Sequence, residues 1–329
     1  MSVPRLTSKM NRLLYEKSMK TDTDRLLDTK DYLSKILTST QYLEINNKLQ
    51  ALPNQMALAA ALAIGHSNPL NTAGRRAKRA LKLLAYLLIS DNALKNTELA
   101  RIQNLPEGSE APLIAEIRSW FTEPAANGTK VASDAVTSIS KMPKWNNVNF
   151  DATDAVRGVY RVDKPFNCYN ACVFWAFQSG AISKRYLWNK LQGKDGNTFF
   201  PTYSQVGWTT ILKFRPDGSS EIDTTGTGPI IVPAGHTVYF ETPAKVFGHV
   251  ACSLGDGRVI SQNSVNIGTS KLNALSSTIQ PEFDKMANAI THIVSIRDMI
   301  AHYFNVANGY RSIQVTNGCF WDPIPAAER

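Results

Sequence analysis

The chain has 329 residues, of which 43% are hydrophobic and 19% are charged, and its net charge is +9. This length fits one large or two ordinary domains, and this composition excludes a disordered protein. Positive charge is concentrated in residues 1–150, which hold 20 Lys and Arg against 13 Asp and Glu, whereas residues 151–329 hold 16 against 14. Such an excess is modest for a nucleic-acid-binding protein, and no motif of that class accompanies it. We therefore expect no specific nucleic-acid partner.

The segment "MSVPRLTSKMNRLLYEKSMK" has no apolar stretch, so we expect no Sec signal peptide. The most apolar run, residues 56–65, is ten residues long, about half of what a bilayer-spanning helix needs. Four cysteines in 329 residues do not form a disulfide scaffold and suit a protein made in a reducing cytosol. We expect no transmembrane segment and no cofactor, and either a cytoplasmic location or secretion without a Sec signal.

The first half is expected to be helical. Residues 22–39 repeat apolar positions at helical spacing after an Asp-rich first turn. Residues 74–90, "GRRAKRALKLLAYLLIS", place an apolar stripe beside a basic one. We interpret this segment as a core helix with a solvated charged face, with binding to an anionic surface as the alternative. Residues 1–130 are accordingly predicted to be a helical domain for targeting or partner binding.

Residues 131–150 are rich in small and polar residues without sustained periodicity and are predicted to be a linker. Residues 151–329 are predicted to form an α+β domain, because a helical segment precedes several strand patterns. The expected strands lie within 230–241, 249–254, 258–265 and 310–317. Residues 281–305 are predicted to form one long helix.

The segment "FNCYNACVFWAFQSGAI" opens this domain. Asn167 is a suitable N-cap, which places Cys168 at the first helical position, and Gly180 is a plausible stop. Unpaired N–H groups and the helix dipole at that position favour a thiolate, which requires a proton acceptor. The following residues leave almost no polar face, so we expect a buried helix in which Cys172 serves packing.

His249 is the best candidate for the proton acceptor, because its strand runs into a Gly255-Asp256-Gly257 turn and returns as a second strand. A three-residue turn sets His249 opposite Asn263, which we predict to orient the ring, with Ser261 on the same face. A two-residue turn would bring Gln262 or Ser264 to that face instead.

The stretch 158–264 resembles the papain-like cysteine hydrolases of the NlpC type and their CHAP amidase relatives. The resemblance rests on "NCYN" with a glycine twelve residues after the cysteine, on "VPAGHTVYF", and on "GHVACSLGDGRVIS". It implies a papain-like fold in which a helix bearing Cys168 packs on an antiparallel sheet. It also implies a peptidase or amidase that acts by acyl transfer, with Cys168 as nucleophile, His249 as base and Asn263 as third residue.

The resemblance, joined to a basic helical domain, indicates a bacterial effector delivered into another cell. Its substrate would be a peptidoglycan peptide or a host protein, and proteolysis, deamidation and transglutamination all remain open. The residues around the cysteine differ from the family's Asp-Cys-Ser-Gly, and Ser261 stands where cell-wall enzymes often have histidine. The alternative from another functional class is a non-catalytic interaction protein that uses such a module as a scaffold.

Two other sites deserve comparison. Cys168, Cys172, His249 and Cys252 could supply four zinc ligands. Residues three apart on a strand point to opposite faces, however, so His249 and Cys252 should not converge. The motif "GCFW" at 318–321 matches methionine sulfoxide reductases, but Pro323 and Pro325 forbid the helix that should follow. We expect Cys319 to be a packing residue.

Overall fold

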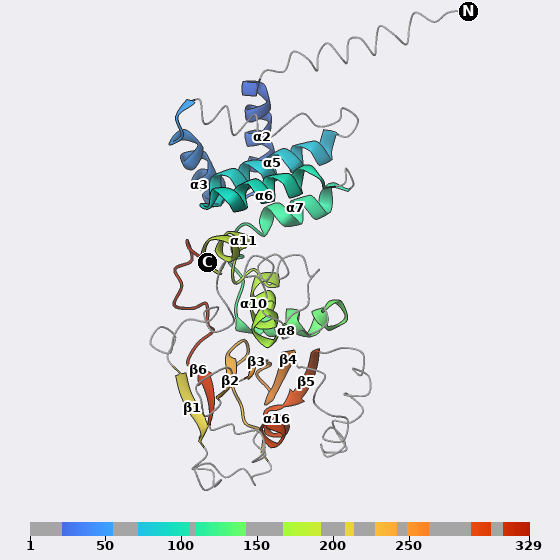
Figure 1. The fold of residues 1–329 in the computed structure, drawn as a ribbon, viewed down its shortest axis with the longest axis vertical. Helices are drawn as coiled ribbons and strands as arrows, with labels where there is room; N and C mark the ends of the chain where they lie inside the picture. Colours follow the sequence, from blue (N-terminus) through green and yellow to red (C-terminus); the bar gives the residue numbers. More distant parts are fainter. Residues whose placement is uncertain are drawn as a thin grey trace, which may run out of the picture. The chain divides into compact units, whose positions relative to one another are not determined.

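A computed structural model describes residues 22–54, 72–105, 109–142, 167–191, 208–213, 228–241, 249–262, 291–303 and 312–329. The chain divides into two compact units, residues 1–120 and 121–329. Figure 1 shows a helical first unit and a second unit that combines helices with a sheet. The second unit therefore has the expected α+β class.

The first unit contains α2 (Asp22–Ile36), α3 (Ser39–Gln50), α5 (Thr72–Leu88), α6 (Asn92–Gln103) and α7 (Glu110–Arg118). The starts of three of these helices are fixed by side-chain caps. Thr38 and Gln41 form a reciprocal capping box at α3, Asp91 caps α6, and Ser109 caps α7. The helical periodicity expected from the first half is thus confirmed for the described residues.

Helix α5 is the central helix of this unit, because it packs against α2, α3, α6 and α7. Its basic residues are largely used inside the unit. Arg76 and Arg79 both pair with Asp28, while Lys78 and Lys82 are buried and donate to Gln103 at the C-terminal end of α6. Residues 74–90 are therefore a core helix, and among its described basic side chains only Arg76 is exposed.

The second unit is built on a six-stranded sheet in the order β1-β6-β2-β3-β4-β5, in which all neighbours are antiparallel. The strands are β1 (Trp208–Lys213), β2 (Thr237–Glu241), β3 (His249–Ser253), β4 (Arg258–Gln262), β5 (Thr291–Ser295) and β6 (Ser312–Thr316). The helical elements are α8 (Gly128–Ser138), η1 (Ile139–Lys141), α10 (Cys168–Gln178), α11 (Lys184–Tyr186), η2 (Leu187–Leu191) and α16 (Ile296–Tyr303).

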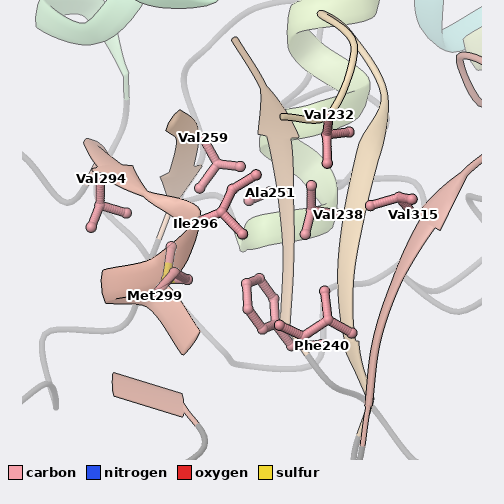
Figure 2. Packing of buried hydrophobic residues seen from close by; sticks show 10 residues of the cluster. Val232, Val238, Phe240, Ala251, Val259, Val294, Ile296, Met299 and Val315 are labelled. Atoms are coloured by element: carbon pink, nitrogen blue, oxygen red, sulfur yellow. The ribbon is translucent and has the colours of Figure 1, made fainter. Parts of the chain in front are cut away.

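The two faces of the sheet are covered by different helices. On one face, alternate strand residues form an apolar cluster with Ile296 and Met299 of α16, as Figure 2 shows. Helix α10 packs on β3 and β4 from the other side and is joined by α8, which contacts both α10 and β4. Because both faces are covered, all five residues of β3 are buried.

The boundary between the units lies earlier than the sequence predicts. Residues 131–150 were expected to be a linker, but α8 begins at Gly128 and packs on α10. Val131, Ala132 and Ala135 are buried, so the small residues that suggested a linker form the packing face of a helix. Buried Trp175 of α10 also donates from Nε1 to the hydroxyl of Ser138 at 3.2 Å. The residues 143–150 lie outside the described part of the chain.

A second difference concerns the predicted helix over residues 281–305. Thr291–Ser295 is strand β5, and the helix begins only at Ile296. The segment "THIVS" contains three β-branched residues, which pack well on the edge of a sheet, and pairing with β4 overrides its helical spacing. Residues 281–290 lie outside the described residues. The strands expected around residues 237–241, 249–253, 258–262 and 312–316 are confirmed.

Candidate functional site

The N-terminus of α10 has the predicted geometry. Asn167 is the N-cap, and its side chain accepts from the Asn170 N–H at 2.9 Å while Asn170 Oδ1 accepts from the Asn167 N–H at 3.3 Å. This reciprocal capping box fixes Cys168 as the first helical residue. The next eight residues are all buried, and Gly180 ends the segment with a φ of 80°. The expected buried helix is confirmed.

The Cys168 thiol lies against strand β3. Backbone hydrogen bonds from Val250, Tyr169 and Cys168 itself act to lower its pKa, but burial is the larger effect and raises the pKa to about 11. The thiol therefore keeps its proton at neutral pH, contrary to the thiolate expected from the helix dipole alone. Val250 directly follows His249, so the sulfur lies beside the peptide group that joins these two residues.

The direction of the Val250 N–H shows where the Cys168 thiol lies relative to strands β3 and β4. Leu254 donates its N–H to Arg258 across the turn to β4, at 2.9 Å. Amides four residues apart on a strand point the same way, so the Val250 N–H also points toward β4. Within the described residues, β3 and β4 pair from the turn only as far as Cys252 and Ile260. The thiol thus lies at an opening between these strands, beside an amide that would otherwise continue the ladder.

The His249 side chain belongs to the other face of the sheet and bridges β3 and β4. His249 pairs with Phe240 of β2, and their ring centroids lie 5.9 Å apart. Phe240 belongs to the apolar cluster on the α16 face, so the His249 side chain starts from that face, whereas α10 covers the opposite one. His249 Nε2 is hydrogen-bonded to the hydroxyl of Ser261 on β4. This bond spans β3 and β4 close to where the thiol meets Val250.

The turn geometry is as predicted, whereas the predicted third residue is not among the described residues. The pairs Cys252–Ile260 and Ser253–Val259 correspond to a three-residue turn at 255–257. Asn263, predicted to orient the ring, lies outside the described residues. The ring partner that the structure does show is Ser261. The sequence signal for Ser261 was its place on the His249 face, two residues short of the directly opposite position.

The end of the sheet near the thiol is polar, whereas its middle is apolar. Gln262 and Thr291 are fully buried and hydrogen-bonded to each other, and Ser261 pairs with buried His292 of β5. Thr291 and His292 could not be assigned to this site from the sequence, because the pattern around them predicted a helix. Buried polar groups need hydrogen-bond partners, and Gln262 and Thr291 supply one to each other.

The remaining cysteines are packing residues. Cys172, Cys252 and Cys319 are buried, and no cysteine of the chain is in a disulfide. Cys252 and His249 point to opposite faces, as expected from their spacing, and the described part of the chain contains no group of three or more His, Cys, Asp or Glu arranged to hold a metal ion. The "GCFW" cysteine, Cys319, follows β6 and precedes a series of turns rather than a helix.

Burial of the thiols predicts a loss of stability at alkaline pH. The folded pKa of Cys168 is about 11 and that of Cys252 about 12, above the ordinary value of about 8.5. Below pH 8.5 the thiols are protonated in both the folded and the unfolded chain, and their contribution to the free energy of unfolding is complete. As pH rises toward 11, the unfolded chain loses protons first, so each thiol lowers the free energy of unfolding by up to about 1.4 kcal/mol per pH unit.

Urea unfolding at pH 7.5, 9 and 10 measures this effect, with Cys252→Ala as the comparison. The variant should be less stable at pH 7.5 because it carries a cavity, but its stability should fall less steeply with pH. Equal slopes for the variant and the wild type would contradict a protonated, buried Cys252.

Within the described residues, no helix has both the length and the apolar character needed to cross a bilayer. Comparison with protein-family models, curated proteins and solved structures finds no match to this chain.

Proposed function

We propose that the protein is a cysteine-dependent hydrolase of papain-like fold that acts on amide bonds through Cys168 and His249. The observation that carries the proposal is the opening between β3 and β4. The Cys168 thiol lies there against the Val250 amide, and the His249–Ser261 hydrogen bond crosses between the same two strands. A nucleophile at a helix tip and an imidazole held by a third group are the parts that acyl transfer requires.

The chemistry follows from these positions. Because Ser261 engages Nε2 of His249, Nδ1 is the nitrogen that would accept the thiol proton. The thiolate would attack the substrate carbonyl to form a tetrahedral intermediate, whose oxyanion the N–H groups at the α10 tip would stabilise. The protonated His249 would then give its proton to the leaving amine. Water, activated by the same imidazole, would hydrolyse the thioester and restore the thiol.

A papain-type substrate would be a peptide or a protein side-chain amide. Its source would be a peptidoglycan peptide or a host protein reached by a delivered bacterial effector, as the sequence resemblance implies. The helical first unit would serve partner binding. The basic helix α5 gives little support to recruitment by an anionic surface, because Arg76 and Arg79 pair with Asp28 inside this unit.

A second candidate function, a non-catalytic interaction module, is favoured by one specific observation. Cys168 is only 8% exposed, and burial raises its pKa to about 11. Such a thiol is unreactive unless a base takes its proton. The two candidates therefore differ in whether His249 controls the reactivity of Cys168.

Alkylation of the full chain by iodoacetamide, followed residue by residue by mass spectrometry at pH 7.5, tests this difference. We expect Cys168 to react first and the His249→Ala variant to slow its reaction by at least about tenfold, because the imidazole is the proton acceptor. Cys172, one helical turn deeper in α10, provides an internal reference.

The matched control is His236→Ala. His236 Nδ1 donates to the Thr316 carbonyl at 2.7 Å at the start of β2, so this variant removes a structural histidine from the same sheet. It should leave alkylation of Cys168 unchanged. If all four cysteines react at one slow rate in the wild type and in His249→Ala, the protein is a scaffold and the proposed hydrolase is rejected.

A further inference from the structure

Three buried polar side chains form a row across β3, β4 and β5. His249, Ser261 and His292 are 6%, 0% and 5% exposed. Ser261 is hydrogen-bonded to His249 Nε2 and pairs directly with His292 in the β4–β5 register. Directly opposed residues of antiparallel strands share a face, so all three side chains start from the face that carries α16. Their neighbours there are apolar, which makes this row the polar part of an otherwise hydrophobic layer.

The spacing brings Ser261 within reach of both rings. Opposed Cβ atoms in an antiparallel pair lie about 4.5–5.5 Å apart, a separation that a hydrogen bond between a serine hydroxyl and an imidazole can bridge. A serine hydroxyl has one proton and two acceptor lone pairs. It can donate to only one of the two rings at a time, so the protonation state of one ring determines whether the hydroxyl donates to the other ring or accepts from it.

We propose that His292 is a positioning residue that sets the tautomer of His249 through Ser261. Neutral His292 accepts the hydroxyl proton of Ser261. The Ser261 oxygen then accepts from Nε2–H of His249, which leaves Nδ1 unprotonated. When His292 is protonated it has only N–H groups to offer, so the Ser261 proton turns to Nε2 of His249 and the ring proton moves to Nδ1.

This inference deepens the proposed function, because an unprotonated Nδ1 is what the Cys168 thiol requires. A wrong tautomer in a nucleophile–base pair costs several orders of magnitude in rate. The second histidine would therefore make the reactivity of Cys168 depend on its own protonation, in addition to that of His249.

Two ionisable side chains of α16, on this face of the sheet, are engaged elsewhere. In α16, Asp298 is hydrogen-bonded to Ser295 and Arg297 donates to the Gly228 carbonyl. Ser295 is at the opposite end of β5 from His292. Helix α10 covers the opposite face, and its Cys168 thiol stays protonated because burial raises its pKa to about 11. The two imidazoles are therefore the ionisable groups of this row.

The test is a titration of the full chain labelled with ¹⁵N-histidine, since the chain has only five histidines. Nitrogen chemical shifts distinguish the two tautomers of each ring. In the wild type, His249 should carry its proton on Nε2 above the pKa of His292 and on Nδ1 below it. In His292→Phe the tautomer of His249 should no longer depend on pH and should have the proton on Nδ1. In His292→Gln, whose side chain keeps an acceptor, it should stay on Nε2.

A second readout is the alkylation rate of Cys168 at pH 7.5. His292→Phe should lower it by at least about tenfold and His292→Gln should restore it, whereas His236→Gln should change neither readout. If His292→Phe does not fold, Ser261→Ala takes its place in the test. In the Ser261→Ala background, His292→Gln should have no further effect on the His249 tautomer or on alkylation of Cys168, because the hydroxyl that links the two rings is absent.

The two proposals fail in different ways. If the His249 tautomer responds to His292 but alkylation of Cys168 does not depend on His249, the row is correct and the hydrolase is rejected. If the tautomer and titration of His249 are the same in the wild type, His292→Phe and Ser261→Ala, the positioning role of His292 is wrong.

Discussion

Cys168→Ala and His249→Ala should each lower turnover of a verified amide substrate by about 10³-fold or more while leaving the fold intact. Acyl transfer needs both the thiol and its proton acceptor, so the loss of either should cost nearly as much as the loss of both. Measurement of kcat/KM for the two single variants and the double variant tests this. The double variant should be no slower than the slower of the two single variants.

The matched control is Cys172→Ala, because Cys172 is a buried cysteine on the same helix. It lies behind the helix tip and has no part in the proposed chemistry, so it should lower stability through a small cavity but keep kcat/KM within a few-fold. Circular dichroism and thermal unfolding verify that each variant is folded. Full activity of Cys168→Ala, or equal losses in Cys168→Ala and Cys172→Ala, would rule out Cys168 as the nucleophile.

The local parts of the candidate site could be predicted because short-range rules decide them. An N-cap preference placed Asn167 and therefore Cys168, and the Gly255–Gly257 turn fixed the register that carries Ser261 to the His249 face. Register alone could not reveal that β3 and β4 separate beyond Cys252. The Cys168 thiol meets Val250 in that stretch, and this is a tertiary contact between α10 and β3.

The burial of Cys168 was also beyond sequence reasoning. The dipole and amides of α10 favour a thiolate, as expected, but desolvation is larger and the pKa rises to about 11. Likewise, His292 lies in a segment whose 3.6-residue spacing predicts a helix, and only pairing with β4 makes it a strand residue. Local spacing therefore identified the nucleophile and base candidates, while the group proposed to position the base depends on long-range pairing.

The domain boundary illustrates the same limit. Helix α8 (Gly128–Ser138) includes the first part of the predicted linker 131–150, and its small residues allow it to approach its neighbours closely. Gly128 meets the turn at Gly235 so closely that a Cβ on Gly235 would lie 2.8 Å from the Gly128 carbonyl oxygen and 2.9 Å from its carbonyl carbon. No large side chain would permit this contact. Small residues, which are typical of linkers, here allow two backbone segments to pack against each other.

Gly235→Ala should therefore destabilise the protein by about 3 kcal/mol or more. Gly235 has a φ of 80°, a left-handed conformation that costs a residue with a Cβ about 1–2 kcal/mol. The new methyl group would also overlap the Gly128 backbone, and overpacking of this kind costs about 1–3 kcal/mol. Urea unfolding at pH 7.5, monitored by tryptophan fluorescence, gives the free energy of unfolding.

Three further glycine variants separate these two contributions. Gly255→Ala carries a positive φ of 91° but its Cβ would lie no closer than 3.1 Å to Ala234, so it should show mainly the dihedral cost. Gly128→Ala has no positive φ but would overlap the Ala234 carbonyl, so it should show mainly the packing cost. Gly228→Ala meets nothing within 4 Å and should stay within about 0.5 kcal/mol of the wild type. If Gly235→Ala is as stable as Gly228→Ala, Gly128 does not pack against the turn at Gly235, and the close contact between α8 and this turn is wrong.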